Sequence, residues 1–141
     1  MNALHRMERF LDQHMIPFDL VMHPHTQTSA ETAHAAGVPP DRVAKGVLLG
    51  GAGCQMVAMI PANQEVHLGK LAQDVGMEIS LADEATVSRL FSECEPGVVP
   101  GLPNAWGVEI VWDDALMEQP DVYLEAGDHE LGMHLGHALE D

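Results

Sequence analysis

The sequence predicts a single α/β domain of the α+β type, in which a mixed and mostly antiparallel β-sheet is flanked by helices. Its 141 residues are the usual size of one domain, and they contain no internal repeat and no long linker. Apolar residues make up 46% of the chain and charged residues 20%, an ordinary globular balance. Helical and strand patterns alternate without a regular βαβ rhythm, which favours a mixed sheet over a doubly wound one. We therefore treat residues 1–141 as one domain.

The first third of the chain predicts two helices and one strand. Apolar residues at helical spacing predict a helix over residues 3–15, and a short strand is expected over 18–23. Thr28 and Glu31 form a capping-box pattern that begins the second helix. Gly37 ends that helix.

The middle of the chain predicts a β-hairpin. A central strand is expected over 43–49 and its partner over 54–60, with a glycine-rich turn at 50–53 between them. Further on, Asp83 is an N-cap candidate for a helix that runs to about Phe91. The remaining expected elements are a helix at 67–75 and strands at 78–81, 108–112 and 122–126. We assign no definite structure to residues 129–139.

The charge of the chain is strongly acidic and unevenly distributed. All six Lys and Arg residues lie within residues 1–89, where ten acids leave a net charge of −4. Residues 90–141 carry twelve acids and no base, a net charge of −12. Because nucleic-acid affinity comes largely from Lys and Arg that neutralise phosphates, the pattern excludes a DNA-binding protein and argues against tight RNA binding by this chain alone. Solubility, or life at high salt, is the simplest reason for the excess of acids.

Several functional classes are excluded by what the sequence lacks. No apolar run is long enough to cross a bilayer, and the N-terminus has no signal-peptide core, so we expect a cytoplasmic protein without membrane contact. Cys54 and Cys94 are too few for a disulfide framework and lack zinc-site spacing. The chain has no nucleophile elbow, Walker loop or dinucleotide-binding glycine motif. We expect no cofactor.

Lys45 is the first candidate functional residue. Strand alternation places it on one face with Val43, Val47 and Leu49. An ammonium between valines on a core strand is costly unless it faces a cleft or has a partner. The chain has only two lysines, which favours function. The alternative is a lysine that reaches the sheet edge or pairs with one of the many carboxylates.

The loop Gly97-Val98-Val99-Pro100-Gly101 is the second candidate. Glycines allow a backbone to present its N–H groups to a ligand at close range, and prolines hold the shape of such a loop. The loop can therefore recognise a carbonyl or a sugar through its main chain. The alternative is a rigid connection between a helix and a strand.

The nine histidines raise the question of a metal site. His23 and His25 would share one face of a strand, and His134 and His137 would share one face of a helix. Neither pair matches a metalloprotease or zinc-finger spacing, so we expect no metal.

An ordered set of segments resembles the YbaK family, the editing domains associated with prolyl-tRNA synthetase. The resemblance covers residues 20–130. The matching segments are His23-Pro24-His25-Thr26, Ser29-Ala30-Glu31-Thr32-Ala33, Ala44-Lys45-Gly46-Val47-Leu48-Leu49, Met59-Ile60-Pro61-Ala62, Cys94-Glu95-Pro96-Gly97-Val98-Val99-Pro100, Val111-Trp112-Asp113-Asp114-Ala115-Leu116 and Val122-Tyr123-Leu124-Glu125-Ala126-Gly127.

The resemblance implies the YbaK fold and an aminoacyl-tRNA deacylase, which hydrolyses the ester of mischarged tRNA, typically proline tRNA carrying alanine or cysteine. Such enzymes act free in the cytoplasm or within prolyl-tRNA synthetase, so the expected partners are the 3′ end of aminoacyl-tRNA and a prolyl-tRNA synthetase. The resemblance makes Lys45 the essential residue, which contacts the substrate near the ester, while the substrate's own hydroxyl assists the chemistry. The residues expected at the substrate are His23, Thr28, Gly46, Gly97, Val98, Val99, Pro100, Gly101, Ala126 and Gly127.

The sequence departs from the family pattern at three positions. The family loop usually reads Gly-x-x-x-Pro, whereas its fifth position here is Gly101. Gly46 stands where many relatives have threonine, and Glu125 where several have a small polar residue. These departures leave two readings open: a freestanding editing enzyme, or a binding module that keeps the pocket without turnover. A metal-dependent hydrolase is the third and weakest alternative.

Overall fold

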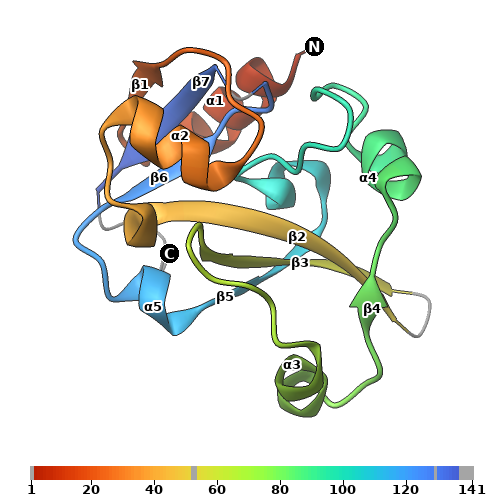
Figure 1. Ribbon diagram of the computed structural model, residues 1–141. Coiled ribbons are helices and arrows are strands. Elements are labelled where there is room, and N and C mark those ends of the chain that lie inside the picture. The colour runs from red at the N-terminus through yellow and green to blue at the C-terminus, as the bar shows by residue number, and fades with distance from the viewer. Residues whose placement is uncertain (1, 52–53, 129, 137–141) are drawn as a thin grey trace.

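The fold is an α/β domain built on one mixed sheet of seven strands (Figure 1). We describe it from a computed structural model, which covers residues 2–51, 54–128 and 130–136. The strands are β1 (Phe18–Met22), β2 (Val43–Gly51), β3 (Cys54–Pro61), β4 (Ser80–Leu81), β5 (Glu109–Trp112), β6 (Val122–Glu125) and β7 (Leu131–Leu135). The α-helices are α1 (Ala3–Gln13), α2 (Ser29–Ala36), α3 (Leu68–Val75), α4 (Glu84–Leu90) and α5 (Asp114–Met117). Two short 3₁₀ helices are η1 (Pro40–Arg42) and η2 (Pro103–Trp106).

The strand order is β1-β7-β6-β2-β3-β5, and β4, which is not part of this order, pairs with β2. Antiparallel pairs join β1 to β7, β7 to β6, β2 to β3 and β2 to β4. Parallel pairs join β2 to β6 and β3 to β5. The sheet is therefore mixed and mostly antiparallel, as the sequence predicts.

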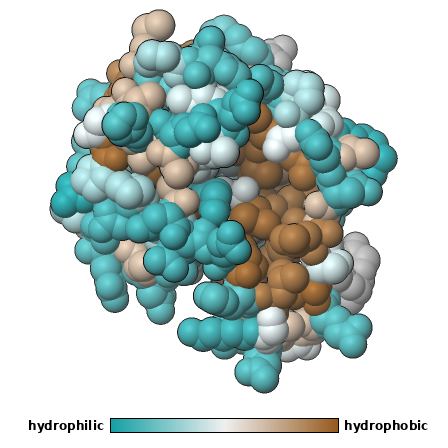
Figure 2. All heavy atoms as spheres, in the orientation of Figure 1, coloured by the Kyte–Doolittle hydropathy of each residue, from teal (hydrophilic) through white to brown (hydrophobic). Residues whose placement is uncertain are grey.

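The two faces of the sheet bury different clusters. One face carries the main core, where α1, α4 and α5 pack on the sheet; its fully buried side chains include Met7, Phe91 and Leu116. The opposite face is covered by α2, through Ala33 against Tyr123, and more loosely by α3. No residue of α3 is fully buried. Figure 2 shows apolar side chains gathered in a hollow over the β2–β3 hairpin, between α3 and α4.

The caps explain where several helices begin and end. Thr28 Oγ1 accepts a hydrogen bond from Glu31 N–H (3.1 Å), which confirms the predicted cap of α2. The Glu31 carboxylate returns to Gln27 N–H (3.1 Å) rather than to the cap residue. Asp83 Oδ1 likewise accepts from Thr86 N–H (2.8 Å) at the start of α4. Because the hydroxyl and the N–H group of Thr86 both donate hydrogen bonds to the carboxylate, the pKa of Asp83 lies below its usual value.

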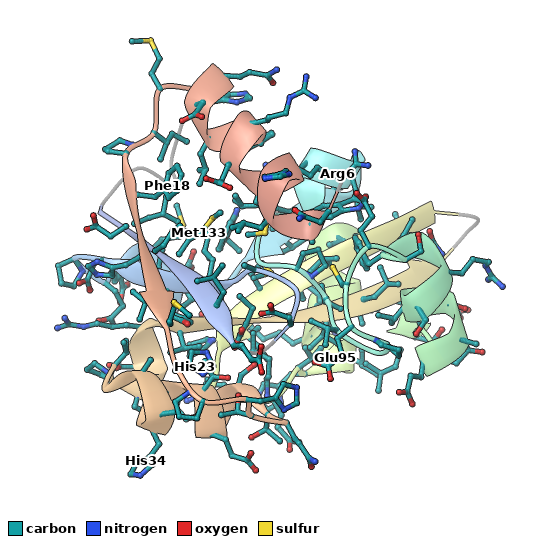
Figure 3. The ribbon with its side chains drawn as sticks, turned by 90° about the horizontal axis from the view of Figure 1, so that it is seen from above. Arg6, Phe18, His23, His34, Glu95 and Met133 are labelled. Carbon is teal, nitrogen blue, oxygen red and sulfur yellow. The ribbon has the colours of Figure 1, made fainter. Side chains whose placement is uncertain are left out.

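A ring contact and a shared carboxylate hold α1 against η2. The Glu93 Oε1 atom accepts hydrogen bonds from Arg6 Nε (2.7 Å) and Trp106 Nε1 (3.1 Å). The guanidinium of Arg6 also lies over the Trp106 ring, 5.2 Å from its centroid. Figure 3 shows Arg6 reaching from α1 towards η2.

Among the described residues, no helix has the length and apolar character needed to cross a bilayer.

The structure corrects several predicted elements. The first helix ends at Gln13 rather than residue 15, because Met15 adopts a left-handed backbone (φ 57°). The segment left without a definite structure contains a strand, β7, so His134 lies on a strand and not on the helix face that its spacing from His137 would suit. His137 lies outside the described residues, as do positions 52–53 of the hairpin turn. The predicted strand at 78–81 is reduced to the two residues of β4.

The fold requires glycine at position 132, because there is no room for a side chain there. A Cβ atom there would lie 2.1 Å from the Cζ and hydroxyl atoms of Tyr123, which is fully buried. We expect Gly132→Ala to lower the free energy of unfolding by about 1–3 kcal/mol, the usual cost of overpacking. Urea denaturation measures the change. Gly136→Ala is the control, because nothing lies within 4 Å of its Cβ position; equal stabilities of the two variants would contradict the prediction.

Candidate functional site

The candidate site begins at an incomplete edge of β2. On one edge β2 pairs with β3 over almost its whole length, from Ala44 to Gly51. On the other edge it pairs with β6 only at Val43 and Ala44, and with β4 only at Leu49 and Gly50. Between these two short ladders, residues 45–48 face a gap in the sheet.

The backbone of Gly46 points into this gap. Val43 O accepts from Ala62 N–H on the β3 side (2.9 Å), and Leu48 O accepts from Ala82 N–H on the opposite side (3.0 Å). Because hydrogen-bonding direction alternates along a strand, the even-numbered residues direct their N–H and C=O groups away from β3. Gly46 therefore presents one donor and one acceptor to the gap.

The loop that contains Gly97 closes one side of the gap. Its two ends are tied to β6 and the residues after it: Glu95 N–H donates to Gly127 O and Gly101 N–H donates to Glu125 O, both at 2.8 Å. Gly97 has a left-handed backbone (φ 81°), and a Cβ there would lie 2.7 Å from Glu84 Oε1. Only glycine fits this position without strain.

Val99 from this loop packs directly on Gly46. A Cβ atom on Gly46 would lie 2.7 Å from Val99 Cγ1 and 3.2 Å from Met59 Sδ. The glycine at 46 thus allows the loop to approach β2 closely. Within the described part of the chain, the Val99 N–H donates to no protein acceptor.

A pocket of about 320 Å³ opens where the gap, this loop and the start of α2 meet. It brings together six of the predicted site residues: Thr28, Lys45, Gly46, Gly97, Val98 and Val99. The sequence analysis did not assign its other lining residues to the site, namely Gln27, Ser29, Ala44 and Glu125. Most side chains in the whole lining are small, so the pocket suits a small ligand group.

Lys45 enters the pocket from β2 and is half-buried. Its Nζ donates to the backbone oxygen of Gln64 at 2.5 Å. Gln64 follows β3, so the ammonium leans towards the β3 side of the pocket. Lys45 therefore lies in a cleft and has a hydrogen-bond partner. These are the conditions under which a lysine on a core strand is not costly.

Other predicted site residues lie beside the pocket and do not line it. Pro100 and Gly101 are buried at the end of the loop, and a Cβ on Gly101 would lie 2.5 Å from Leu124 Cβ. The Gly101 N–H is used in the bond to Glu125 O, a bond that a proline at this position would lose. Ala126 and Gly127 continue beyond β6, and both are buried.

His23 is buried under α2 and does not reach the pocket lining. Its Nδ1 lies 2.7 Å from Pro24 O, and its ring centroid lies 6.2 Å from that of Tyr123. Burial raises the pKa of Tyr123 strongly, and the carboxylates of Glu125 and Asp128 add to the effect. Tyr123 therefore remains a neutral phenol.

The histidines within the described residues do not gather as the alternative metal site would require. β1 ends at Met22, so His23 and His25 do not share a strand face. His25 Nε2 instead lies 3.0 Å from the Glu95 carboxylate, and His34 points away from the molecule in Figure 3. His134 Nε2 contacts Asp121 Oδ2 at 2.7 Å. In the described ranges, no group of three His, Cys, Asp or Glu residues has the arrangement of a metal site.

Cys94 lies just before the loop and is partly buried. Burial, followed by the Glu93 and Asp128 carboxylates, raises the pKa of its thiol to about 12. A thiol of this kind carries almost no thiolate at neutral pH and is a poor nucleophile.

The sequence and the fold match known proteins. The model of the aminoacyl-tRNA editing domain matches residues 23–140 of the chain. The chain belongs to the aminoacyl-tRNA editing domain family. No curated protein sequence matches this editing domain significantly.

Solved structures share the fold of this editing domain. The hypothetical protein APE2540 superposes with a TM-score of 0.81 at 23% identity, over 94% of this chain and 89% of that one. A candidate trans-editing enzyme for prolyl tRNA synthetase gives a TM-score of 0.78 at 21% identity, over 96% and 87%. A signal transduction protein candidate from Marinobacter aquaeolei VT8 gives 0.73 at 18% identity, over 94% of this chain and 26% of that one.

Cys94 provides a test of the local electrostatics. In a Cys54→Ser background, we expect iodoacetamide to alkylate Cys94 at pH 8 roughly 10³-fold more slowly than free cysteine, because the pKa is raised by about three units. The rate should keep rising above pH 10, with circular dichroism recording that the fold persists. A rate that levels off near pH 9 would show an ordinary thiol.

Proposed function

We propose that this protein is a trans-editing deacylase that hydrolyses the ester of mischarged tRNA, with proline tRNA carrying a small wrong amino acid as its substrate. The observation that carries the proposal is the pocket at the gap in β2, which combines Lys45 with the main chain of Gly46 and of the Gly97 loop. The family supplies the general substrate, an aminoacyl-tRNA. A structure with the same fold is a candidate trans-editing enzyme for prolyl tRNA synthetase, which supports the narrower substrate.

The pocket lining supports a small aminoacyl group. Ala44, Gly46 and Gly97 contribute little or no side chain, and Val98 and Val99 close the pocket with branched apolar groups. Because the volume is about 320 Å³, an alanyl or cysteinyl ester and part of the terminal ribose fill it.

The chemistry in this proposal depends on positioning and on backbone donors. Water adds to the ester carbonyl carbon, and the bond to the ribose oxygen then breaks, which releases the amino acid and a tRNA with a free 3′ hydroxyl. The N–H groups of Gly46 and Val99 are the donors available to the developing oxyanion. Lys45 holds the 3′ end near the ester by its positive charge, and the ribose hydroxyl of the substrate helps to place the water. This route needs no metal and no thiol.

The charge of the chain affects how tRNA reaches the site. With a net charge of −16 and no base after Arg89, the protein attracts phosphates weakly. We propose that prolyl-tRNA synthetase, in the cytoplasm, releases or presents the mischarged tRNA, so that this domain has to bind only the 3′ end.

Removal of the Lys45 ammonium is the direct test. The protein is incubated with a panel of mischarged tRNAs, which includes proline tRNA carrying alanine or cysteine, and the loss of ester is followed over time. We expect selective hydrolysis that falls by about 10² in Lys45→Ala, the usual effect of losing one preorganised electrostatic contact.

The matched control is Lys70→Ala, which removes the only other lysine from the exposed surface of α3. It should retain hydrolysis. No ester loss with any tRNA, with or without a prolyl-tRNA synthetase, would refute the enzymatic function and leave a binding module.

A further inference from the structure

Glu125 contributes a carboxylate to the pocket that the chemistry above does not use. It is the last residue of β6, only 3% of its surface is exposed, and it lines the same pocket as Lys45. Carboxylates are rarely buried to this degree, because the loss of hydration is costly. Its place in the lining of the pocket, beside Lys45, suggests a role in ligand binding.

The register of the sheet places Glu125 next to Lys45. The parallel ladder pairs Val43 with Tyr123 and Ala44 with Leu124, so the next positions along the two strands are Lys45 and Glu125. Alternation puts both side chains on the face that carries Val43 and Tyr123. The two charged groups therefore enter the pocket from neighbouring strands.

The Lys45 ammonium nevertheless leans away from Glu125. β2 lies between β6 and β3 in the sheet, and the Nζ atom donates to Gln64 O on the β3 side. The pocket thus has a cationic side and an anionic side. The neighbouring Tyr123 adds no charge, because burial together with the Glu125 and Asp128 carboxylates raises the pKa of its phenol.

We propose that Glu125 binds the α-ammonium group of the aminoacyl ester, so that the site accepts only esters with a free amino group. This inference rests on the proposed function and deepens it. The α-ammonium is the one cation that an alanyl or cysteinyl ester brings to the pocket. N-acylation turns it into a neutral amide, which loses the charge-assisted bond and leaves the Glu125 carboxylate to face an uncharged group. N-blocked aminoacyl-tRNAs and peptidyl-tRNAs are therefore excluded as substrates.

Ligand binding tests the proposal without any need for turnover. The probes are 3′-alanylamino-3′-deoxyadenosine, whose amide link resists hydrolysis, and its N-acetyl derivative, both titrated by calorimetry. We expect the wild-type protein to bind the free amine about tenfold or more tightly, the effect of one hydrogen bond between charged groups. Glu125→Gln keeps the shape of the side chain and should reduce the preference to less than about threefold.

The controls separate charge from shape. Glu125→Asp retains the carboxylate and should retain a preference for the free amine, whereas Glu109→Gln removes an exposed carboxylate on β5 and should change nothing. A steric exclusion of the acetyl group would survive in Glu125→Gln, and that result would overturn the proposal. Equal binding of the two probes by the wild-type protein, or binding of neither, would also overturn it, whether or not the variants fold.

The outcome is distinguishable from failure of the proposed function. Amine-selective binding without ester hydrolysis would refute the deacylase and leave the ammonium site intact. Hydrolysis of alanyl and N-acetylalanyl esters at equal rates would keep the deacylase and remove the ammonium site.

Discussion

The site depends on the way β2 shares its second edge between two short partners. A strand inside a sheet normally uses all its N–H and C=O groups in ladders, since unpaired backbone groups are costly when buried. Here β6 and β4 pair with opposite ends of β2 and leave the middle unpaired on that side. The Gly97 loop covers this interval without continuing the ladder, so backbone groups remain available to a ligand inside an otherwise closed sheet.

The glycines at 46 and 101 are consequences of this arrangement. The loop must approach β2 at Gly46 and β6 near Leu124, and at each point a Cβ atom would come too close to its neighbour. The departures from the family pattern therefore fit the packing of the loop. The bond from Gly101 N–H to Glu125 O also fixes the end of β6, which carries the anionic side of the pocket.

The sequence predicted the elements whose signals are local. Caps at Thr28 and Asp83 and the apolar alternation around Lys45 depend on a few neighbouring residues, and the structure confirms the helices and the strand that they indicate. β7 was not assigned because its pattern, Leu-Gly-Met-His-Leu, is weak alone; it is a strand because β1 and β6 pair with it on both sides. Sequence reasoning also did not place Glu125 in the pocket or Gln64 beside Lys45, because their proximity to Lys45 follows from the arrangement of the strands and not from spacing along the chain.

The parallel pairing of β2 with β6 also determines when the pocket can assemble during synthesis. Lys45 is made first, and its neighbour Glu125 follows eighty residues later. Contacts between such distant segments carry a high loop-closure cost and form late in folding. The β2–β3 hairpin, whose contacts are local, can form on the ribosome first. Its apolar face then stays uncovered until later segments of the chain pack on it. The pocket therefore cannot assemble until the segment that contains Glu125 has been synthesised.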